Sequence, residues 1–161
     1  MDTLINEQGI AIIKKWEGLV DGKPDTAGLD PYLCPAGVPT IGWGSIWGID
    51  GTRVTMAHRP ITEEEAQYLL QRELRQTETY VAKLVGVPVT LNQFSALCSL
   101  TYNIGSGRFQ TSTMRMKLNR SDYNGAGDEF WKWRRANGRI LQGLVNRRKE
   151  EHELYKEKDY D

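Results

Sequence analysis

A chain of 161 residues with five Trp and seven Tyr is long enough to bury the core of one domain and too aromatic to be disordered. It has no run near the ~18 apolar residues of a membrane span, and its acidic start does not fit a signal peptide. The net charge is zero, but residues 82–161 carry 14 basic against 9 acidic side chains, which favours an anionic partner or contact with the acidic half of the same fold.

The first predicted helix begins at Thr3 or Asn6 and ends at Glu17. Gly18 offers a C-terminal stop, because glycine readily adopts the left-handed conformation that ends many helices. The apolar residues that recur at helical spacing are Ile5, Ile12, Ile13 and Trp16.

From residue 19 to residue 59 the pattern changes to Gly, Pro and Asp between short β-branched stretches. Residues 37–48, "GVPTIGWGSIWG", alternate in the manner of a strand, and "GIDGTR" supplies a turn. We therefore expect a small, irregular β region inserted after the first helix.

Two capping boxes mark the starts of the next helices. Thr62 and Glu65 open the segment "TEEEAQYLLQREL", and Thr90 and Gln93 open "TLNQFSALCSLTYNIG". The first apolar stripe is expected to contain Ala66, Leu69, Leu70, Tyr80, Val81, Leu84 and Val85, with a stop near Gly86 and Pro88. The second helix is expected to place Leu91, Phe94, Leu97 and Cys98 on one face.

Shorter helices are predicted over residues 113–118, 125–137 and 143–156. The predicted fold class is therefore α+β and mostly α, in a single domain of residues 1–161. Residues 1–60 are expected to form the first helix and the β lobe, and residues 61–161 the helical lobe.

The two cysteines, Cys34 and Cys98, are far apart and form no disulfide framework, which favours a reduced site of synthesis. Together with His58 and His152 they could supply four metal ligands, but no pair has the spacing of a zinc site. We expect neither a metal nor another cofactor.

Glu17 is the first candidate for acid catalysis. It lies in the last turn of the predicted helix, where the negative helix end and partial desolvation beside Trp16 favour a protonated carboxyl. A general acid must be protonated in this way. The alternative is an exposed glutamate at a helix end with no role.

Arg148 is the second candidate, because it shares a stripe of the last helix with apolar residues. A buried arginine needs a carboxylate partner, which could be Glu151 at i+3 or Glu17 across the fold. Otherwise Arg148 extends to solvent.

A third candidate is residues 130–139, "FWKWRRANGR", in which aromatic and basic residues alternate. Such a segment can bind single-stranded nucleic acid or sugars. Helical spacing puts Phe130, Trp133 and Arg134 on one side, so core packing under a basic outer face is the simpler alternative.

Several segments, taken in order, resemble the phage-type lysozymes, glycoside hydrolase family 24, which tailed bacteriophages use as endolysins. The resemblance covers nearly the whole chain. The matching segments are "KKWEG", "YLCPAGVPTIGWGS", "ITEEEAQYLL", "NQFSALCSLTYNIGSGRF", "ST" at 112–113, "KLN" at 117–119 and "GLVNRRKEE". The resemblance implies a lysozyme-like fold with two lobes joined by a long helix.

The family's catalytic pattern is Glu, eight residues, Asp or Cys, five residues, Thr. Cys34 and Thr40 keep the five-residue spacing, but sixteen residues separate Glu17 from Cys34. We interpret this difference as an eight-residue insertion before residue 31. The insertion brings in three further carboxylates, Asp21, Asp25 and Asp30; Asp25 and Asp30 are the main alternatives to Cys34 as the second catalytic group.

The resemblance implies hydrolysis of the β-1,4 bond between N-acetylmuramic acid and N-acetylglucosamine in peptidoglycan. Glu17 would be the acid, Thr40 would orient the attacking water, and Cys34 would hold or partly deprotonate that water. The alternative is that Cys34 only fills space and a loop aspartate acts instead. Arg148, or less favourably Arg147, would hold Glu17 in position.

The resemblance also implies the partners. Peptidoglycan is the expected substrate, with no nucleic acid and no stable membrane association. The protein is expected to be a monomer that accumulates in the host cytoplasm and reaches the periplasm and wall through a separate holin. The alternatives are a lytic transglycosylase that uses a single Glu, a wall-binding module without activity, and a nucleic-acid-binding protein built on residues 130–139.

Overall fold

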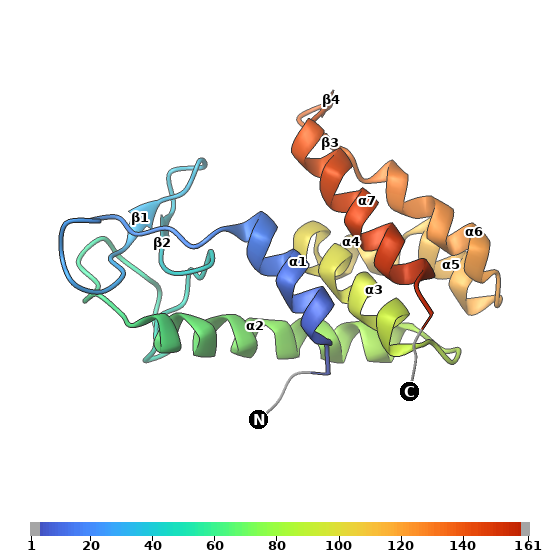
Figure 1. Cartoon of the computed structure of the whole chain (residues 1–161), viewed down its shortest axis with the longest axis horizontal. Helices are drawn as coiled ribbons and strands as arrows, with labels where there is room; N and C mark the ends of the chain where they lie inside the picture. The colour runs from blue at the N-terminus through green and yellow to red at the C-terminus, as the bar shows by residue number, and fades with distance from the viewer. Residues whose placement is uncertain (1–3, 159–161) are drawn as a thin grey trace. The chain divides into compact units, whose positions relative to one another are not determined.

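The computed structural model describes residues 4–158, and the chain divides into two compact units (Figure 1). One unit comprises residues 17–73, and the other comprises the chain on either side of it. The predicted α+β, mostly helical fold class is confirmed. The units divide the chain differently from the predicted lobes, because the first helix packs on a helix of residues 91–104 and so belongs to the helical unit.

That first helix, α1 (Glu7–Glu17), starts at the later of the two predicted positions. The side chain of Asn6 accepts a hydrogen bond of 3.0 Å from the backbone N–H of Gly9 and so caps the helix. The backbone N–H of Asn6 also donates to Ser95 Oγ at 2.9 Å. Gly18, with φ +74°, ends the helix as expected, whereas Thr3 lies outside the described residues.

The β region of residues 17–73 contains only two short antiparallel strands, β1 (Tyr32–Leu33) and β2 (Pro39–Thr40). The strand predicted over residues 37–48 is therefore too long. Gly42 and Gly44 have φ values of +65° and +96°, which no extended strand allows. The buried core of the unit of residues 17–73 contains Ile41, Trp43, Val54, Ile61, Ala66, Leu69 and Leu70.

The capping box at the start of α2 (Glu63–Leu84) is confirmed. Thr62 Oγ1 accepts from the Glu65 N–H at 3.0 Å, and Glu65 Oε1 accepts from the Thr62 N–H at 3.1 Å. Arg59 also binds both carboxylate oxygens of Glu65. The Arg59 guanidinium and the Thr62 N–H lower the pKa of Glu65 to about 2.

The stripe predicted for α2 is partly wrong. Ala66, Leu69, Leu70 and Val81 are buried, but Tyr80 is 43% exposed. Successive residues on a helix point about 100° apart, so Tyr80 leaves the buried face that Val81 occupies. No helix within residues 4–158 is long and apolar enough to cross a membrane.

In the helical unit, α1 and α7 (Gln142–Lys156) pack against α3 (Leu91–Ile104). The predicted capping box of Thr90 and Gln93 is present, and residues 95–101 are all buried. The predicted single apolar face is wrong at Leu91, which is 50% exposed. Leu91 is the first residue of α3, and the continuous buried part of this helix begins only at Ser95.

Four short elements follow, namely α4 (Ser106–Gln110), α5 (Thr113–Asn119), α6 (Tyr123–Asp128) and the 3-10 helix η1 (Glu129–Lys132). The helix predicted over 125–137 is confirmed only in part. Residues 125–132 lie in α6 and η1, and the chain then turns into a hairpin of β3 (Arg135–Ala136) and β4 (Arg139–Ile140). Asn137 and Gly138 have φ values of 52° and 76°, as a two-residue hairpin turn requires.

Candidate active site

Glu17, Cys34 and Thr40 all belong to the unit of residues 17–73. Glu17 is the last residue of α1 and is partly exposed. A β-carbon built on Gly44 would lie 3.8 Å from Oε2 of Glu17, so the Glu17 carboxylate borders the glycine-rich segment that follows β2. Gly44 has φ +96°, a conformation that side-chain-bearing residues rarely adopt.

The β1–β2 hairpin brings Cys34 and Thr40 to this segment. Tyr32 pairs directly with Thr40, so their side chains lie on the same side of the hairpin. Cys34 follows Tyr32 by two residues and begins the turn. Its N–H donates to the Val38 carbonyl at 3.0 Å, and its carbonyl accepts from the Gly37 N–H at 2.8 Å. The five-residue spacing between Cys34 and Thr40 is therefore the length of one tight hairpin connection.

The Cys34 thiol is surrounded by groups that favour its ionised form. Hydrogen bonds from the backbone at Val38 and Ala36 lower the pKa of Cys34, and the Thr40 side chain contributes to the same shift. The Thr40 hydroxyl also donates to the Val38 carbonyl at 2.8 Å. Because a hydroxyl has one proton, Thr40 can donate to a Cys34 thiolate only by giving up that bond.

Tyr32 belongs to the site although the sequence did not single it out. Burial raises the pKa of its phenol, and the negative charges of Cys34 and Glu17 raise it further. The phenol donates to the Gly42 carbonyl at 3.3 Å and receives a hydrogen bond from the backbone of Gly44. The phenol of Tyr32 therefore interacts electrostatically with both candidate catalytic groups, Cys34 and Glu17. The signal that could have identified it is the two-residue alternation with Cys34.

The carboxylates of the inserted loop have structural partners. Asp30 is 7% exposed, and its Oδ2 accepts a hydrogen bond of 2.9 Å from Thr26 Oγ1. Asp21 Oδ1 accepts from the backbone N–H groups of Lys23 at 2.9 Å and of Asp30 at 3.0 Å. Asp25 is exposed. These bonds account for Asp21 and Asp30 as groups that fold the loop, and a catalytic role for Asp25 or Asp30 stays a prediction.

Arg148 lies in the helical unit and is fully buried, so its predicted alternative of extending to solvent is wrong. Its Nε is 2.7 Å from Oε1 of Glu151, which confirms the predicted i+3 partner. Arg147 Nε lies 3.3 Å from Oε2 of the same carboxylate, and Ser99 Oγ donates to that oxygen at 2.5 Å. That Arg148 supports Glu17 stays a prediction.

Glu151 is thus a buried carboxylate between two buried guanidinium groups. Burial raises the pKa of Glu151 above its ordinary value, while Arg148, Arg147 and Ser99 oppose that shift. Each charged group of this cluster has an oppositely charged partner in the same unit. Such a paired, buried cluster is typical of ion pairs that belong to the folded core.

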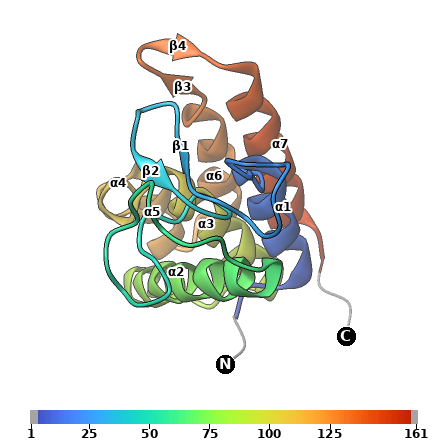
Figure 2. The ribbon, with the colours of Figure 1, turned by 90° about the vertical axis from the view of Figure 1, so that its left-hand side faces the viewer.

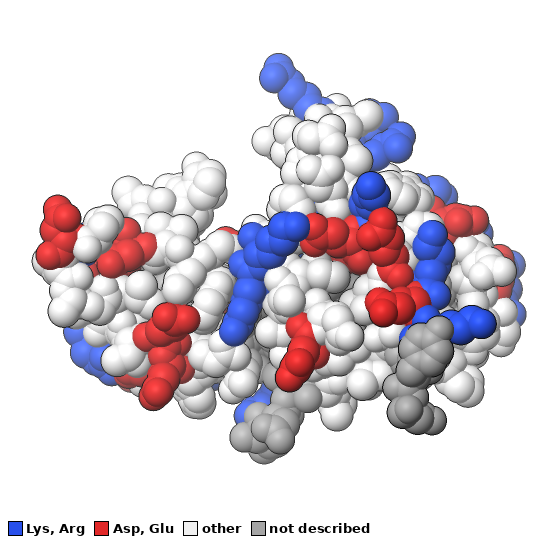
Figure 3. All heavy atoms as spheres, viewed as in Figure 1, with Lys and Arg blue, Asp and Glu red and all other residues white. Residues whose placement is uncertain are grey.

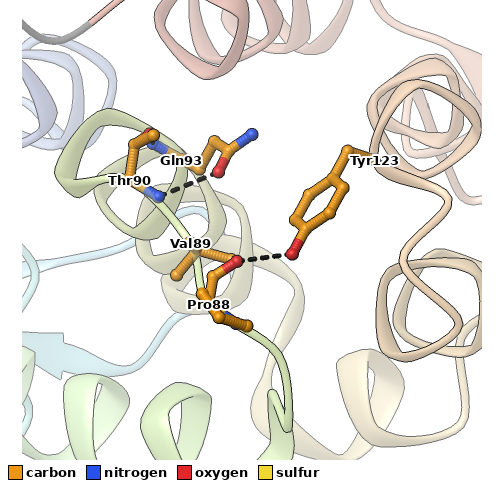
Figure 4. A pocket seen from close by; sticks show the side chains of 5 residues that line it. All are labelled: Pro88, Val89, Thr90, Gln93 and Tyr123. Carbon is orange, nitrogen blue, oxygen red and sulfur yellow. Dashed lines mark hydrogen bonds between the residues drawn. The ribbon is translucent and has the colours of Figure 1, made fainter.

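A hollow in the helical unit is lined by Pro88, Val89, Thr90, Gln93 and Tyr123 (Figure 4). The Tyr123 hydroxyl donates to the Pro88 carbonyl at 2.7 Å. These five residues include no carboxylate, thiol or imidazole, so they offer no acid–base pair. Within residues 4–158 no group of three or more His, Cys, Asp or Glu side chains is arranged to hold a metal ion.

Alkylation of Cys34 should follow an apparent pKa below the ~8.5 of an ordinary cysteine, because backbone hydrogen bonds favour the thiolate. The measurement is the rate of iodoacetamide labelling of the folded protein against pH. Thr40→Val is expected to move the pKa of Cys34 upward. Cys98 is an internal control, since it is fully buried, which raises its pKa well above the ordinary value. An ordinary or raised pKa at Cys34 would contradict the geometry.

Comparison with known proteins bears on the whole chain. Residues 14–151 match the family described as phage lysozyme. An endolysin of Acyrthosiphon pisum secondary endosymbiont phage 1 is 39% identical over 155 residues, which cover 94% of this chain and 97% of that protein. An endolysin of Salmonella phage P22 is 36% identical, with the same coverage of both chains. The solved endolysin of Escherichia coli O157:H7 phage FAHEc1 is 34% identical and superposes with a TM-score of 0.82, over 100% of this chain and 97% of that one.

Proposed function

The chain belongs to the phage lysozyme family, and from this premise we propose that it is an endolysin that cleaves peptidoglycan. The proposed reaction is hydrolysis of the β-1,4 bond between N-acetylmuramic acid and N-acetylglucosamine. The observation that carries the proposal is the grouping of a carboxyl, a thiol and a hydroxyl in one unit around Tyr32, at Glu17, Cys34 and Thr40.

Glu17 acts as the general acid. Its proton passes to the glycosidic oxygen as the bond from that oxygen to C1 of the muramic acid breaks, which releases the leaving sugar as a neutral alcohol. Water then adds to C1, and solvent returns a proton to Glu17. Glu17 is the last residue of α1, so the helix fixes the backbone from which its carboxyl group extends.

Cys34 and Thr40 activate and orient the attacking water. The thiolate of Cys34 accepts a proton from the water as it attacks and then releases that proton to solvent, which balances the proton that solvent returns to Glu17. The Thr40 hydroxyl orients the water through its lone pairs or its proton. The lowered pKa of Cys34 supports this role, because an ordinary thiol is mostly protonated at neutral pH. Asp30 and Asp25 remain the alternative groups, and Arg148 is proposed to position Glu17.

The products distinguish this reaction from its nearest alternative. We expect digestion of purified peptidoglycan to release fragments that end in a reducible N-acetylmuramic acid, because water is the acceptor. Reduction with borohydride followed by mass spectrometry of the fragments tests this expectation. A lytic transglycosylase would instead give anhydro ends that lack one water and resist reduction, and reducible N-acetylglucosamine ends would mean cleavage of the other glycosidic bond. Either result would overturn the proposed reaction.

Membership of the same family also supports a proposed cellular setting. The protein is proposed to act as a monomer, to accumulate in the host cytoplasm and to reach the wall through membrane lesions made by a separate holin. Peptidoglycan is the only molecule that the protein is proposed to bind, because the holin acts on the membrane and not on this protein.

A further inference from the structure

Residues 130–149 contain seven Lys or Arg and no Asp or Glu. Three of the seven have ion-pair partners: Lys132 pairs with Glu129, and Arg147 and Arg148 pair with Glu151. A fourth, Lys149, is exposed on α7. The other three, Arg134, Arg135 and Arg139, cluster at the β3–β4 hairpin. None of these three forms an ion pair with any residue that the structure describes.

The hairpin holds these guanidinium groups on an ordered backbone. Arg135 pairs with Ile140, Ala136 pairs with Arg139, and the Leu141 N–H donates to the Arg134 carbonyl at 3.0 Å. The turn at Asn137 and Gly138 has the left-handed conformation that a two-residue connection needs. In Figures 1 and 2 the hairpin lies beyond the N-terminal end of α7, at the edge of its unit.

The exposed side chains of residues 135–141 include arginines, aliphatic groups and the Asn137 amide, but no carboxylate. Arg135 and Arg139 are exposed, and Ile140 is 52% exposed. On the face seen in Figure 3, the top of the helical unit, where the hairpin lies, shows Lys and Arg side chains and no Asp or Glu. Exposed charge of one sign without internal partners attracts a polyanion.

The register of the hairpin favours a carboxylate polymer over a lipid bilayer. Directly paired residues share a face, so Arg135 shares one face with Ile140 and Ala136 shares the other with Arg139. Each face therefore carries one arginine, and neither is wholly apolar. An element that inserts into a membrane surface separates an apolar face from a charged one. Guanidinium groups, in contrast, bind carboxylates in a two-pronged geometry.

We propose that the β3–β4 hairpin is a docking arm that binds carboxylates of the peptide stems of peptidoglycan, through Arg135 and Arg139 with support from Arg134. This inference rests on the proposed function, which supplies the polymer, but it concerns retention on the wall and not bond cleavage. The arm would hold the enzyme on an insoluble polyanion while the residues of the other unit act on the glycan.

The test is the double variant Arg135→Gln/Arg139→Gln in the presence of Glu17→Gln, which prevents digestion of the walls during the assay. Binding is measured by co-sedimentation with purified peptidoglycan sacculi. At low ionic strength we expect the dissociation constant to rise about tenfold, as the loss of two exposed charge contacts implies. At about 0.5 M salt the difference should nearly vanish, because the Debye length becomes shorter than 5 Å.

The matched control is Lys23→Gln/Lys83→Gln, which removes the same net charge at two exposed positions away from the hairpin and should change binding by less than about twofold. Arg135→Lys/Arg139→Lys should restore part of the affinity, because charge is kept and the forked geometry is lost. On sacculi whose carboxyl groups have been amidated, the Glu17→Gln parent and its Arg135→Gln/Arg139→Gln variant should bind with equal affinity.

Three results would overturn the inference: equal binding of the glutamine variant and its parent to native sacculi, a difference that persists on amidated sacculi, or dependence on the hairpin only for anionic vesicles or DNA. The proposed function is judged separately, from the products that the active protein releases. If the protein released muramidase products but its binding did not depend on the hairpin, only the docking-arm inference would be rejected, and the proposed function would stand. Circular dichroism of each variant confirms that the exposed substitutions leave the fold unchanged.

Discussion

Glu17→Gln is expected to reduce the rate of cell-wall lysis by about 10²–10⁴-fold, the usual contribution of a positioned general acid. The amide keeps the size of the side chain but has no proton of carboxylic acidity to give to the glycosidic oxygen. The fold should persist, because an uncharged group is at least as favourable as a carboxylate at the C-terminal end of α1. The measurement is the loss of turbidity of a suspension of purified walls, with circular dichroism as the check on folding.

The control is Glu63→Gln, which changes an exposed glutamate of the same unit at the start of α2. It should retain the activity of the unchanged protein. A folded Glu17→Gln protein with full activity would remove Glu17 from the mechanism and, with it, the proposed reaction.

Variants at the second catalytic position complete this experiment. Cys34→Ala should be much less active, and Cys34→Asp should retain activity, because a carboxylate can also accept a proton from water. Asp25→Asn and Asp30→Asn test the alternative that a loop aspartate acts instead. If Cys34→Ala were fully active and either loop variant inactive, the assignment of Cys34 would be wrong. Asp30→Asn needs a stability measurement beside it, since Asp30 is buried and bonded to Thr26.

The second large effect concerns stability. Glu151→Ala is expected to lower the free energy of unfolding by about 3–5 kcal/mol, because it leaves Arg147 and Arg148 buried without their carboxylate. The measurement is urea unfolding at neutral pH, followed by circular dichroism. Glu153→Ala is the matched control, since Glu153 is exposed on the same helix, and it should cost less than about 0.5 kcal/mol.

Ser99→Ala keeps the prediction testable if Glu151→Ala does not fold. It removes the 2.5 Å hydrogen bond to Oε2 of Glu151 and should cost about 1.5–3 kcal/mol, the range for hydrogen bonds to charged groups. If both variants were as stable as Glu153→Ala, the cluster would contribute nothing to the fold. Buried ion pairs are costly to break even where an apolar replacement of the whole cluster would be harmless, so the single substitutions are the informative ones.

Sequence patterns nominated Glu17, Cys34 and Thr40 as a candidate site, and their catalytic roles stay predictions. The five residues between Cys34 and Thr40 correspond to one hairpin connection, so the spacing alone was enough to bring the two residues together. Tyr32 was missed, although its two-residue alternation with Cys34 is visible in the sequence, because only the pairing of Tyr32 with Thr40 shows that this alternation belongs to a β hairpin. The role of Asp30 was equally hidden, since its burial and its bond to Thr26 depend on how the inserted loop closes.

The sequence by itself determined the features that depend on near neighbours in the chain. The capping boxes at Thr62 and Thr90, the end of α1 at Glu17 and the i+3 pairing of Arg148 with Glu151 all arise from contacts within one helical turn. The alternative partners of Arg148 could still be ranked only once the burial of α7 was known.

Tertiary structure alone decided the features that depend on distant contacts. It decided that residues 135–140 form a hairpin, although the helix predicted over 125–137 extended into them, and that Tyr80 and Leu91 are exposed. Local propensity differs by only about 1 kcal/mol per residue between conformations, so burial against other elements overrides it. The arginines of the hairpin became visible for the same reason: a sequence shows which charges are present, and only the fold shows which of them form no ion pair among residues 4–158.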